Sequence, residues 1–238
     1  MVWSQIRWYL RWGIDTIRYE GPHILLWRML TLGLFPFGRL SMDSFCRKDL
    51  TEPLGETRAK VHLIVSQATE AHIDQLAALV AKRYSPKRKR ELFTTHSIQE
   101  TIRGRFQQGA RCFVGKIGTQ MVHYNWIFFH RKEWLVGHFV ISLNDDEALC
   151  DDGFTVREWR GKGIHGAINN QMLLHLQRSG IRRAYTFVDM DNISSRKALH
   201  RLGWDCYGIG LSFTAHRTNR VWMWRVRGTL EPFVTNGV

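Results

Sequence analysis

The sequence contains no arrangement of cysteines or histidines that would bind a metal ion. Its four cysteines, Cys46, Cys112, Cys150 and Cys206, lie far apart and form no C-x-x-C pair, and its eleven histidines contain no H-E-x-x-H. We therefore predict no metal cofactor. The same scatter predicts reduced thiols in a cytoplasmic protein and no disulfide framework.

Long apolar runs are also missing. The longest, residues 24–37, contains Arg28 and Pro36 and is shorter than the ~20 residues that span a bilayer. Arg7 and Arg11 interrupt the N-terminal stretch, so no secretory signal is predicted either.

Acidic residues are too few to balance the basic ones. The 238 residues include 34 Lys and Arg against 21 Asp and Glu, a formal net charge of +13, with 44% hydrophobic residues. The hydrophobic content predicts a globular chain with one sizeable domain plus an appendage. The charge favours an anionic partner: nucleic acid, a phospholipid surface or a phosphorylated small molecule.

Composition divides the chain into three parts. Residues 1–57 form a basic, aromatic extension, residues 58–228 the main domain, and residues 229–238 a tail. Within the extension, apolar residues at helical spacing predict an amphipathic helix from Trp3 to Arg18. This helix either docks on the main domain or lies on a membrane through residues 1–20.

A basic cluster runs from Lys82 to Arg90. It is either a solvated loop or a docking patch for an anionic acceptor. The cluster lacks regularly interleaved aromatic residues, so nucleic acid is not a predicted partner.

Strand and helix patterns alternate through the main domain. We expect strands over residues 61–65, 111–117, 120–129, 134–143, 148–156, 184–188, 204–214 and 221–226, and helices over 69–80, 97–106, 164–180 and 192–202. The fold class is therefore α/β or α+β. Ser97 and Glu100 form a capping box that marks the start of the second helix.

The segment from Thr155 to Gly166, TVREWRGKGIHG, joins a predicted strand to a predicted helix. A glycine-rich loop at a helix start leaves backbone N–H groups unpaired at the positive end of the helix dipole, where phosphate binds. Glycines here can also do no more than make the turn. Arg160 and Lys162 add cations and Trp159 a flat apolar wall, which favours phosphate binding.

Two segments together resemble the GNAT N-acetyltransferase superfamily, over roughly residues 58–227. The segment from Arg160 to His165 is similar to that family's coenzyme A loop, and the segment from Asn192 to Trp204 to its asparagine and Leu-Gly-aromatic segment. The resemblance implies a mixed, mostly antiparallel sheet with helices on both faces. It also implies central strands that splay apart to admit the coenzyme.

The resemblance also implies roles for particular residues. Phe154 and Val156 would offer strand-edge backbone to the pantetheine amides, while Asn192 and Ser195 would lie near the pantetheine and thioester. The pyrophosphate would be surrounded by the loop residues Arg160, Gly161, Lys162, Gly163, Ile164 and Gly166.

The chain departs from the family pattern at two positions. His165 stands where glycine or alanine is usual, although Gly166 follows at once. Leu199 stands where many members place a tyrosine that protonates the leaving thiolate. That acid is therefore not available here.

Aminolysis of a thioester needs a base for the amine proton and a backbone N–H that polarises the carbonyl. The candidate bases precede the loop: Glu147, Asp151 and Asp152. On a regular strand Asp151 and Asp152 face opposite ways, so only one of them can face the cleft. His123 is a further candidate, although a lone histidine is more often simply packed.

We predict an acyltransferase that moves an acyl group, most simply from acetyl-CoA, to a primary amine of an unidentified acceptor. The segment Thr155–Ile164 is similar to acetyltransferases of bacterial surface polysaccharide or lipid assembly. The alternative is a non-catalytic GNAT-like protein that docks on an anionic membrane or nucleic acid through its N-terminal helix and basic loop. The predicted location is the cytoplasm, with contact at the inner face of the membrane as the alternative in which residues 1–20 bind lipid.

Overall fold

The computed structural model describes residues 26–27, 29–31, 37–83, 95–129, 139–215, 217–218, 221–229 and 231–235. The predicted helix Trp3–Arg18 and the basic cluster from Tyr84 onward lie outside the described residues. The strands are β1 Gly38–Asp49, β2 Ile64–Ala68, β3 Arg111–Ile117, β4 Gln120–Phe129, β5 Phe139–Ile141, β6 Glu147–Thr155, β7 Arg183–Asp189, β8 Asp205–Ala215, β9 Val221–Gly228 and β10 Phe233–Thr235. The α-helices are α3 Ile73–Arg83, α5 Thr95–Gln107, α6 Ile164–Arg178 and α7 Ile193–Arg201.

The chain forms two compact units. The larger comprises Cys46–Phe187, Ala198–Cys206 and Glu231–Val238, and the smaller the remaining segments. In the larger unit the strand order is β2-β3-β4-β6-β7-β1, and in the smaller one β1-β8-β9. The β2/β3, β3/β4, β4/β6 and β8/β9 pairs are antiparallel and β6/β7 is parallel, which confirms a mixed, mostly antiparallel sheet with helices.

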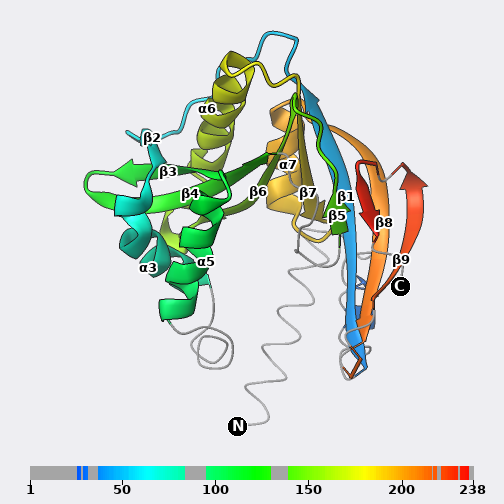
Figure 1. The fold of residues 1–238 in the computed structure, drawn as a ribbon. Coiled ribbons are helices and arrows are strands. Elements are labelled where there is room, and N and C mark those ends of the chain that lie inside the picture. The colour runs from blue at the N-terminus through cyan, green and yellow to red at the C-terminus, as the bar shows by residue number, and fades with distance from the viewer. Residues whose placement is uncertain are drawn as a thin grey trace. The chain divides into compact units, whose positions relative to one another are not determined.

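Helices cover both faces of the sheet in the larger unit (Figure 1). On β3, Phe113 packs its ring 5.2 Å from His175 of α6. On β4, Trp126 lies 5.2 Å from Phe106 of α5, and its partner across the strands is Cys112, the neighbour of Phe113. Because neighbouring residues of a strand face opposite ways, α6 covers one face and α5, with α3 packed beside it, covers the other.

Strand β1 was not expected from the sequence. Its residues, GRLSMDSFCRKD, do not alternate between apolar and polar, yet Phe45 and Cys46 are fully buried. A strand with neighbours on both sides buries polar residues too, here Asp43 and Ser44. The strand precedes the predicted domain start at residue 58, and the three-part division of the chain stays a prediction.

The prediction of four reduced cysteines is wrong for two of them. Cys46 of β1 and Cys206 at the start of β8 form a disulfide across 160 residues of chain. Spacing along the chain cannot reveal a pairing that depends on two strand ends meeting in space. Cys112 and Cys150 are free and buried.

Two helical features also bear on the predictions. Helix α5 begins at Thr95, two residues before the expected cap at Ser97, so the capping box does not mark its start. None of the helices in the described part of the chain is long and apolar enough to cross a membrane.

The disulfide should stabilise the fold mainly by restricting the unfolded chain. We expect the double variant Cys46→Ser/Cys206→Ser to lose about 5 kcal/mol of unfolding free energy, as closure of a long loop predicts. Guanidinium unfolding measures the loss, and reduction of the wild-type protein with dithiothreitol should reproduce it. Equal midpoints for oxidised wild type and double variant would contradict the disulfide.

Candidate active site

Strand β6 leaves its parallel neighbour part-way along its length. The β6/β7 register runs only through Glu147↔Arg183, Ala148↔Ala184 and Leu149↔Tyr185, although β6 continues to Thr155 and β7 continues beyond Tyr185. On its other edge β6 stays paired with β4 as far as His123↔Thr155. From Cys150 onward one edge of β6 therefore has no strand partner among the described residues of the larger unit, in agreement with the predicted splaying of central strands.

A β-bulge interrupts β6 just after this divergence. The register jumps from Trp126↔Asp151 to Tyr124↔Phe154, so Asp152 and Gly153 are left without partners on β4. Asp152 has a φ of 58°, the single non-glycine positive φ among the described residues. Such backbone persists only where its surroundings hold it, and bulges commonly re-aim side chains beside functional sites.

Asn125 and Gly153 fit the bulge together. The Asn125 side-chain oxygen accepts a hydrogen bond of 2.9 Å from the Trp126 N–H, and the side chain is buried. A Cβ at position 153 would lie 3.2 Å from the Asn125 side chain, so glycine leaves room for the amide. The tripeptide Asp151-Asp152-Gly153 is typical of a turn, although it lies inside a segment for which the sequence predicts a strand.

The bulge also overturns the expectation that Asp151 and Asp152 face opposite ways. Asp151 is opposite Trp126, so the two side chains share the face covered by α3 and α5. Asp152 bonds to Arg83 of α3 and Arg105 of α5, so it lies on the same face. The extra residues of the bulge remove the alternation on which the expectation rested.

Asp152 is held between two arginines. One carboxylate oxygen accepts from Arg83, and the other accepts from Arg105 Nη1 at 2.5 Å. The Asp152 side chain is 14% exposed, and the Arg105 guanidinium lies 5.1 Å from the centre of the Trp126 ring. Both carboxylate oxygens are thus occupied by guanidinium donors, so Asp152 ties the bulge to α3 and α5.

The Asp151 carboxylate is less well satisfied than that of Asp152. Its Oδ2 atom is buried and has no hydrogen-bond partner. Burial, reinforced by the neighbouring Asp152 charge, raises the pKa of Asp151 to about 7. A carboxyl group whose pKa is near the working pH can both take up and release a proton, which is what a general base requires.

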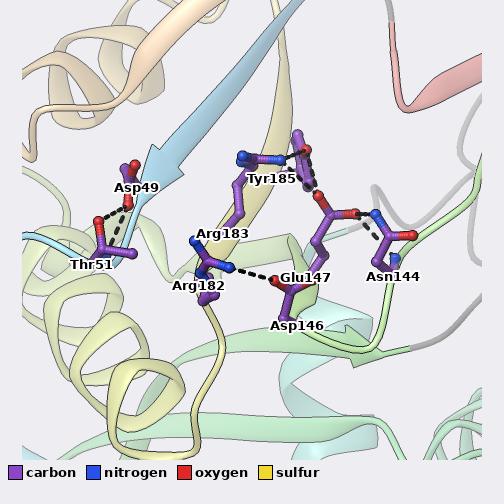
Figure 2. A network of polar contacts seen from close by, with 8 residues as sticks. All are labelled: Asp49, Thr51, Asn144, Asp146, Glu147, Arg182, Arg183 and Tyr185. Carbon is purple, nitrogen blue, oxygen red and sulfur yellow. Dashed lines mark hydrogen bonds and ion pairs between the residues drawn. The ribbon is translucent and has the colours of Figure 1, made fainter.

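Glu147 is committed to a structural network (Figure 2). Its carboxylate accepts from Arg183 Nη1 at 3.0 Å, from the Tyr185 hydroxyl at 2.9 Å and from the Asn144 backbone N–H at 3.0 Å. The residue is 3% exposed and lies where β6 is still paired with β7. A carboxylate with its acceptor sites occupied joins two strands and a turn, so Glu147 is the weakest of the three candidate bases.

His123 and His165 pack against each other on the opposite face. Their ring centres are 5.5 Å apart, and His123 Nδ1 lies 2.7 Å from Thr155 Oγ1. Burial lowers the pKa of His165 to about 4 and that of His123 well below its usual value, so both rings are neutral near pH 7. His123 therefore lies across the sheet from Asp151. His165, the departure from the family pattern, packs on β4, and Asn169 lies within hydrogen-bond distance of it.

The loop after β6 has the predicted strand, turn and helix order. Gly161 and Gly163 both have φ of 76°, and Gly163 is the N-cap residue of α6. No side chain caps the helix start, so its first N–H groups face outward from the loop. A backbone bond of 2.9 Å from the Lys60 N–H to the Lys162 carbonyl fastens the loop to the segment before β2.

The two loop cations are steered by aromatic rings. Arg160 donates from Nε to the Thr155 carbonyl at 3.1 Å and lies 5.7 Å from the centre of the Phe154 ring. The Lys162 ammonium lies 4.1 Å from the centre of the Trp159 ring. Both cations are thus held by contacts within the loop and the end of β6, in the segment that leads into α6.

The predicted pantetheine contacts differ in what they can offer. The Val156 N–H donates to the Val122 carbonyl, and the Val156 carbonyl accepts from the Trp159 N–H, both at 3.0 Å. The Val156 N–H is thus already in use, while its carbonyl keeps a second lone pair, and the role assigned to this residue stays a prediction. Phe154 lies on the part of β6 that has left β7, so the role assigned to it stays a prediction.

The second segment of the resemblance opens α7. The Asn192 side-chain oxygen accepts from the Ser195 N–H at 3.2 Å, so Asn192 caps this helix. Both residues belong to the smaller unit, and their contact with a coenzyme stays a prediction. Leu199, at the position of the missing tyrosine, is 5% exposed and packs in the core.

An open groove of about 670 Å³ lies elsewhere in the larger unit. It is lined by Gln108, Gly109, Arg111, Phe129, Asp145, Ser179 and Ile181. Ser179 follows the last turn of α6, about 20 Å along the helix from the glycine loop. The groove is therefore separate from the candidate site.

No group of His, Cys, Asp or Glu in the described ranges could hold a metal ion.

Three solved structures share this architecture. A GCN5-related N-acetyltransferase from Sphaerobacter thermophilus superposes with a TM-score of 0.53 at 12% identity, covering 85% of this chain. A protein assigned to the GNAT acetyltransferases from Novosphingobium aromaticivorans gives 0.50 at 11% identity over 80% of the chain. A conserved protein of unknown function from Staphylococcus epidermidis gives 0.51 at 12% identity over 78%. The chain has the GNAT fold.

The chain spans 57%, 66% and 64% of the lengths of these three structures. Neither a family model nor a curated protein matches the sequence. At such low identity the likeness establishes the GNAT fold, and activity has to be argued from the residues of this chain.

The arginine bridge at the bulge should be a stabilising element. We expect Asp152→Asn to cost about 2 kcal/mol of unfolding free energy, because two guanidinium groups, one of them mostly buried, lose their counter-charge. Denaturant unfolding measures the change. Glu56→Gln is the matched control, since Glu56 and Arg58 form an ion pair with side chains 69% and 80% exposed. Equal effects of both variants would show that the bridge has no special role.

Proposed function

We propose that this protein is an acyltransferase that uses a coenzyme A thioester, most simply acetyl-CoA, to acylate a primary amine. One observation carries the proposal: Asp151, with a pKa of about 7 and an unpartnered buried oxygen, lies where β6 bulges and parts from β7. The GNAT fold and the glycine loop at the start of α6 support it.

The reaction needs few groups. The Asp151 carboxylate takes a proton from the neutral amine as the amine nitrogen attacks the thioester carbonyl carbon, and this proton later passes to the leaving thiolate. The tetrahedral oxyanion is stabilised by N–H groups on the free edge of β6. The C–S bond then breaks, and the thiolate leaves and takes up a proton, the amide being the second product. Asp152 bonds to the two arginines and supports the bulge.

Donor binding is assigned to the loop and the first turn of α6. The N–H groups of Gly161, Lys162, Gly163, Ile164 and Gly166 are proposed to bind the pyrophosphate, together with the Arg160 and Lys162 side chains. A Cβ at Gly166 would lie 3.3 Å from Thr57, and one at Gly163 would lie 3.4 Å from the Arg58 carbonyl oxygen. The loop thus leaves little room for side chains on the side that faces residues 57–58.

The acceptor and the location are proposals as well. The basic composition suits an acceptor in surface polysaccharide or lipid assembly, met at the inner face of the membrane by the N-terminal residues 1–20. The prediction of a cytoplasmic location rests on four unpaired cysteines. Two of these four form the Cys46–Cys206 disulfide, so they no longer support it.

Substitution of Gly163 should abolish donor binding. Gly163→Asp forces an L-residue into a φ of 76° and places a carboxylate where the pyrophosphate would lie, so we expect coenzyme A affinity to fall at least about tenfold. Isothermal titration calorimetry measures the affinity. Gly109→Asp is the control, because Gly109 has a φ of 79° but lies at the end of α5, beside the separate groove. Unchanged binding by Gly163→Asp would remove the loop from the donor site.

Asp151 should control the pH dependence of the reaction. The base acts only when deprotonated, so kcat/KM should rise with pH and level off above about 7. Asp151→Asn should lower the rate about 10²- to 10⁴-fold and abolish the rise. Free thiol release from acetyl-CoA measures the rate. An aromatic amine is a suitable acceptor because it stays neutral through this range.

Unfolding experiments give an independent check on Asp151. Its folded pKa is raised, so the protonated form is favoured in the folded state, and stability falls as pH rises from about 4 to about 7. Asp151→Asn should therefore gain stability relative to wild type across that window. Asp146→Asn, which alters a weakly paired and 46% exposed carboxylate, should show neither effect. A wild-type rate profile that is flat through pH 7 would exclude Asp151 as the base.

A further inference from the structure

Large exposed hydrophobic side chains are concentrated in the smaller unit. Among the described residues one lies in the larger unit, Ile64, which is 49% exposed. The others all belong to the smaller unit: Leu26, Met29, Leu30, Phe37, Trp222, Trp224 and Val226. Such a concentration marks an interaction surface more often than chance exposure does.

Three residues of β9, Trp222, Trp224 and Arg227, lie on the same face of the sheet as their partners on β8. Trp222 is opposite Phe213, and Trp224 is opposite Leu211. The register then shifts, so Val226 has no partner and Arg227 is opposite Ile209. Directly opposed residues lie on the same face, so the shift brings an arginine onto the face of the two indoles. We name this face the Trp face; it consists of Ile209, Leu211, Phe213, Trp222, Trp224 and Arg227.

The Trp face is open while the reverse face is covered. Trp222 and Trp224 are 43% and 50% exposed, and Trp222 stacks on Phe213 with ring centres 6.0 Å apart. On the reverse face of β8, Gly208, Gly210 and Ser212 are buried. Strand β9 ends the sheet order, so the Trp face reaches the edge of the sheet. The described residues thus leave the indoles uncovered at a sheet edge.

Charge around the Trp face has a single sign. The sequence from residue 206 to residue 230 contains four arginines, Arg217, Arg220, Arg225 and Arg227, and no Asp or Glu. Arg227 is exposed on the Trp face, and Arg217 is exposed in the turn between β8 and β9, whereas Arg225 is opposite Gly210 and lies on the reverse face. Exposed indoles with positive charge beside them are complementary to an anionic partner.

Three classes of partner differ in how well their chemistry fits the Trp face. A second copy of this chain also carries a formal charge of +13 and would bring like charges together. A nucleic acid would stack on the indoles, but it offers nothing to cover the aliphatic residues of the Trp face, Ile209 and Leu211, which are both half-buried. Anionic lipid offers both acyl chains for aliphatic groups and phosphates for arginine, and tryptophan is favoured at the boundary between them.

We propose that the Trp face binds an anionic phospholipid surface. The indoles of Trp222 and Trp224 enter the headgroup layer, and Arg227 binds lipid phosphates beside them. The proposal concerns a different surface from residues 1–20, and it does not depend on the acyltransferase activity. It would place an enzyme of this kind at the membrane through its folded sheet.

Vesicle sedimentation of the full chain tests the proposal. Wild type should sediment with phosphatidylcholine vesicles that contain phosphatidylglycerol, less at high salt, and little with phosphatidylcholine alone. Trp222→Ser/Trp224→Ser and Arg227→Glu should each weaken binding about tenfold or more. Two controls match these changes in exposure and charge: Ile64→Ser, and Arg103→Glu on the exposed side of α5. Both should bind as wild type does.

Additional measurements distinguish loss of vesicle binding from loss of folding and from binding to another class of partner. Circular dichroism and thermal melting establish that each variant is folded, and Trp224→Ser alone serves if the double variant is not. The proposal is overturned if the Trp variants sediment as wild type does. It is also overturned if deletion of residues 1–20 abolishes binding while the Trp variants lose none. A dimer that the Trp variants abolish, or displacement of vesicles by single-stranded DNA, favours the other partner classes and also overturns it. The assays contain no coenzyme or amine, so failure of the acyltransferase proposal cannot affect them.

Discussion

The candidate site depends on the way β6 parts from β7. Three residue pairs hold the two strands together, and then β6 continues with β4 alone. A strand that keeps one neighbour and loses the other exposes backbone groups inside a sheet, and these must be satisfied by other partners. The bulge at Asp152 lies at this place, and the bridge from Asp152 to Arg83 and Arg105 fastens it to two helices. Without the bridge, an aspartate with positive φ would have little to hold it there.

The sheet separates two kinds of chemistry at this point. Asp151 and Asp152 lie on the face of α3 and α5, where two arginines pair with the Asp152 carboxylate while the buried Oδ2 atom of Asp151 has no hydrogen-bond partner among the described residues. His123 and His165 lie on the face of α6 as neutral, packed rings. The histidines therefore support the start of the glycine loop through Thr155, while the acid that can move a proton stands across the strand.

Local patterns predicted the glycine loop and most of the strands and helices, because their causes are local. Glycine spacing sets the turn at Gly161 and Gly163, and apolar periodicity sets α6. Features that depend on distant partners were missed. The polar strand β1 is recognisable only from its neighbours, and the disulfide only once Cys46 and Cys206 meet. The bulge appears in the sequence as nothing more than an Asp-Asp-Gly tripeptide inside an expected strand.

The three acids before the loop show why a sequence cannot rank candidate bases. All three precede the same motif, and in the sequence they differ only in their distance from it. In the structure they differ by their partners alone: Glu147 is bound by an arginine, a tyrosine and an amide, and Asp152 by two arginines, while a buried oxygen of Asp151 has no hydrogen-bond partner. A carboxylate that is well bound in the resting protein must lose those bonds before it can take a proton. The least satisfied acid is therefore the one best able to act, and its identity depends on partners contributed by α3, α5 and β7.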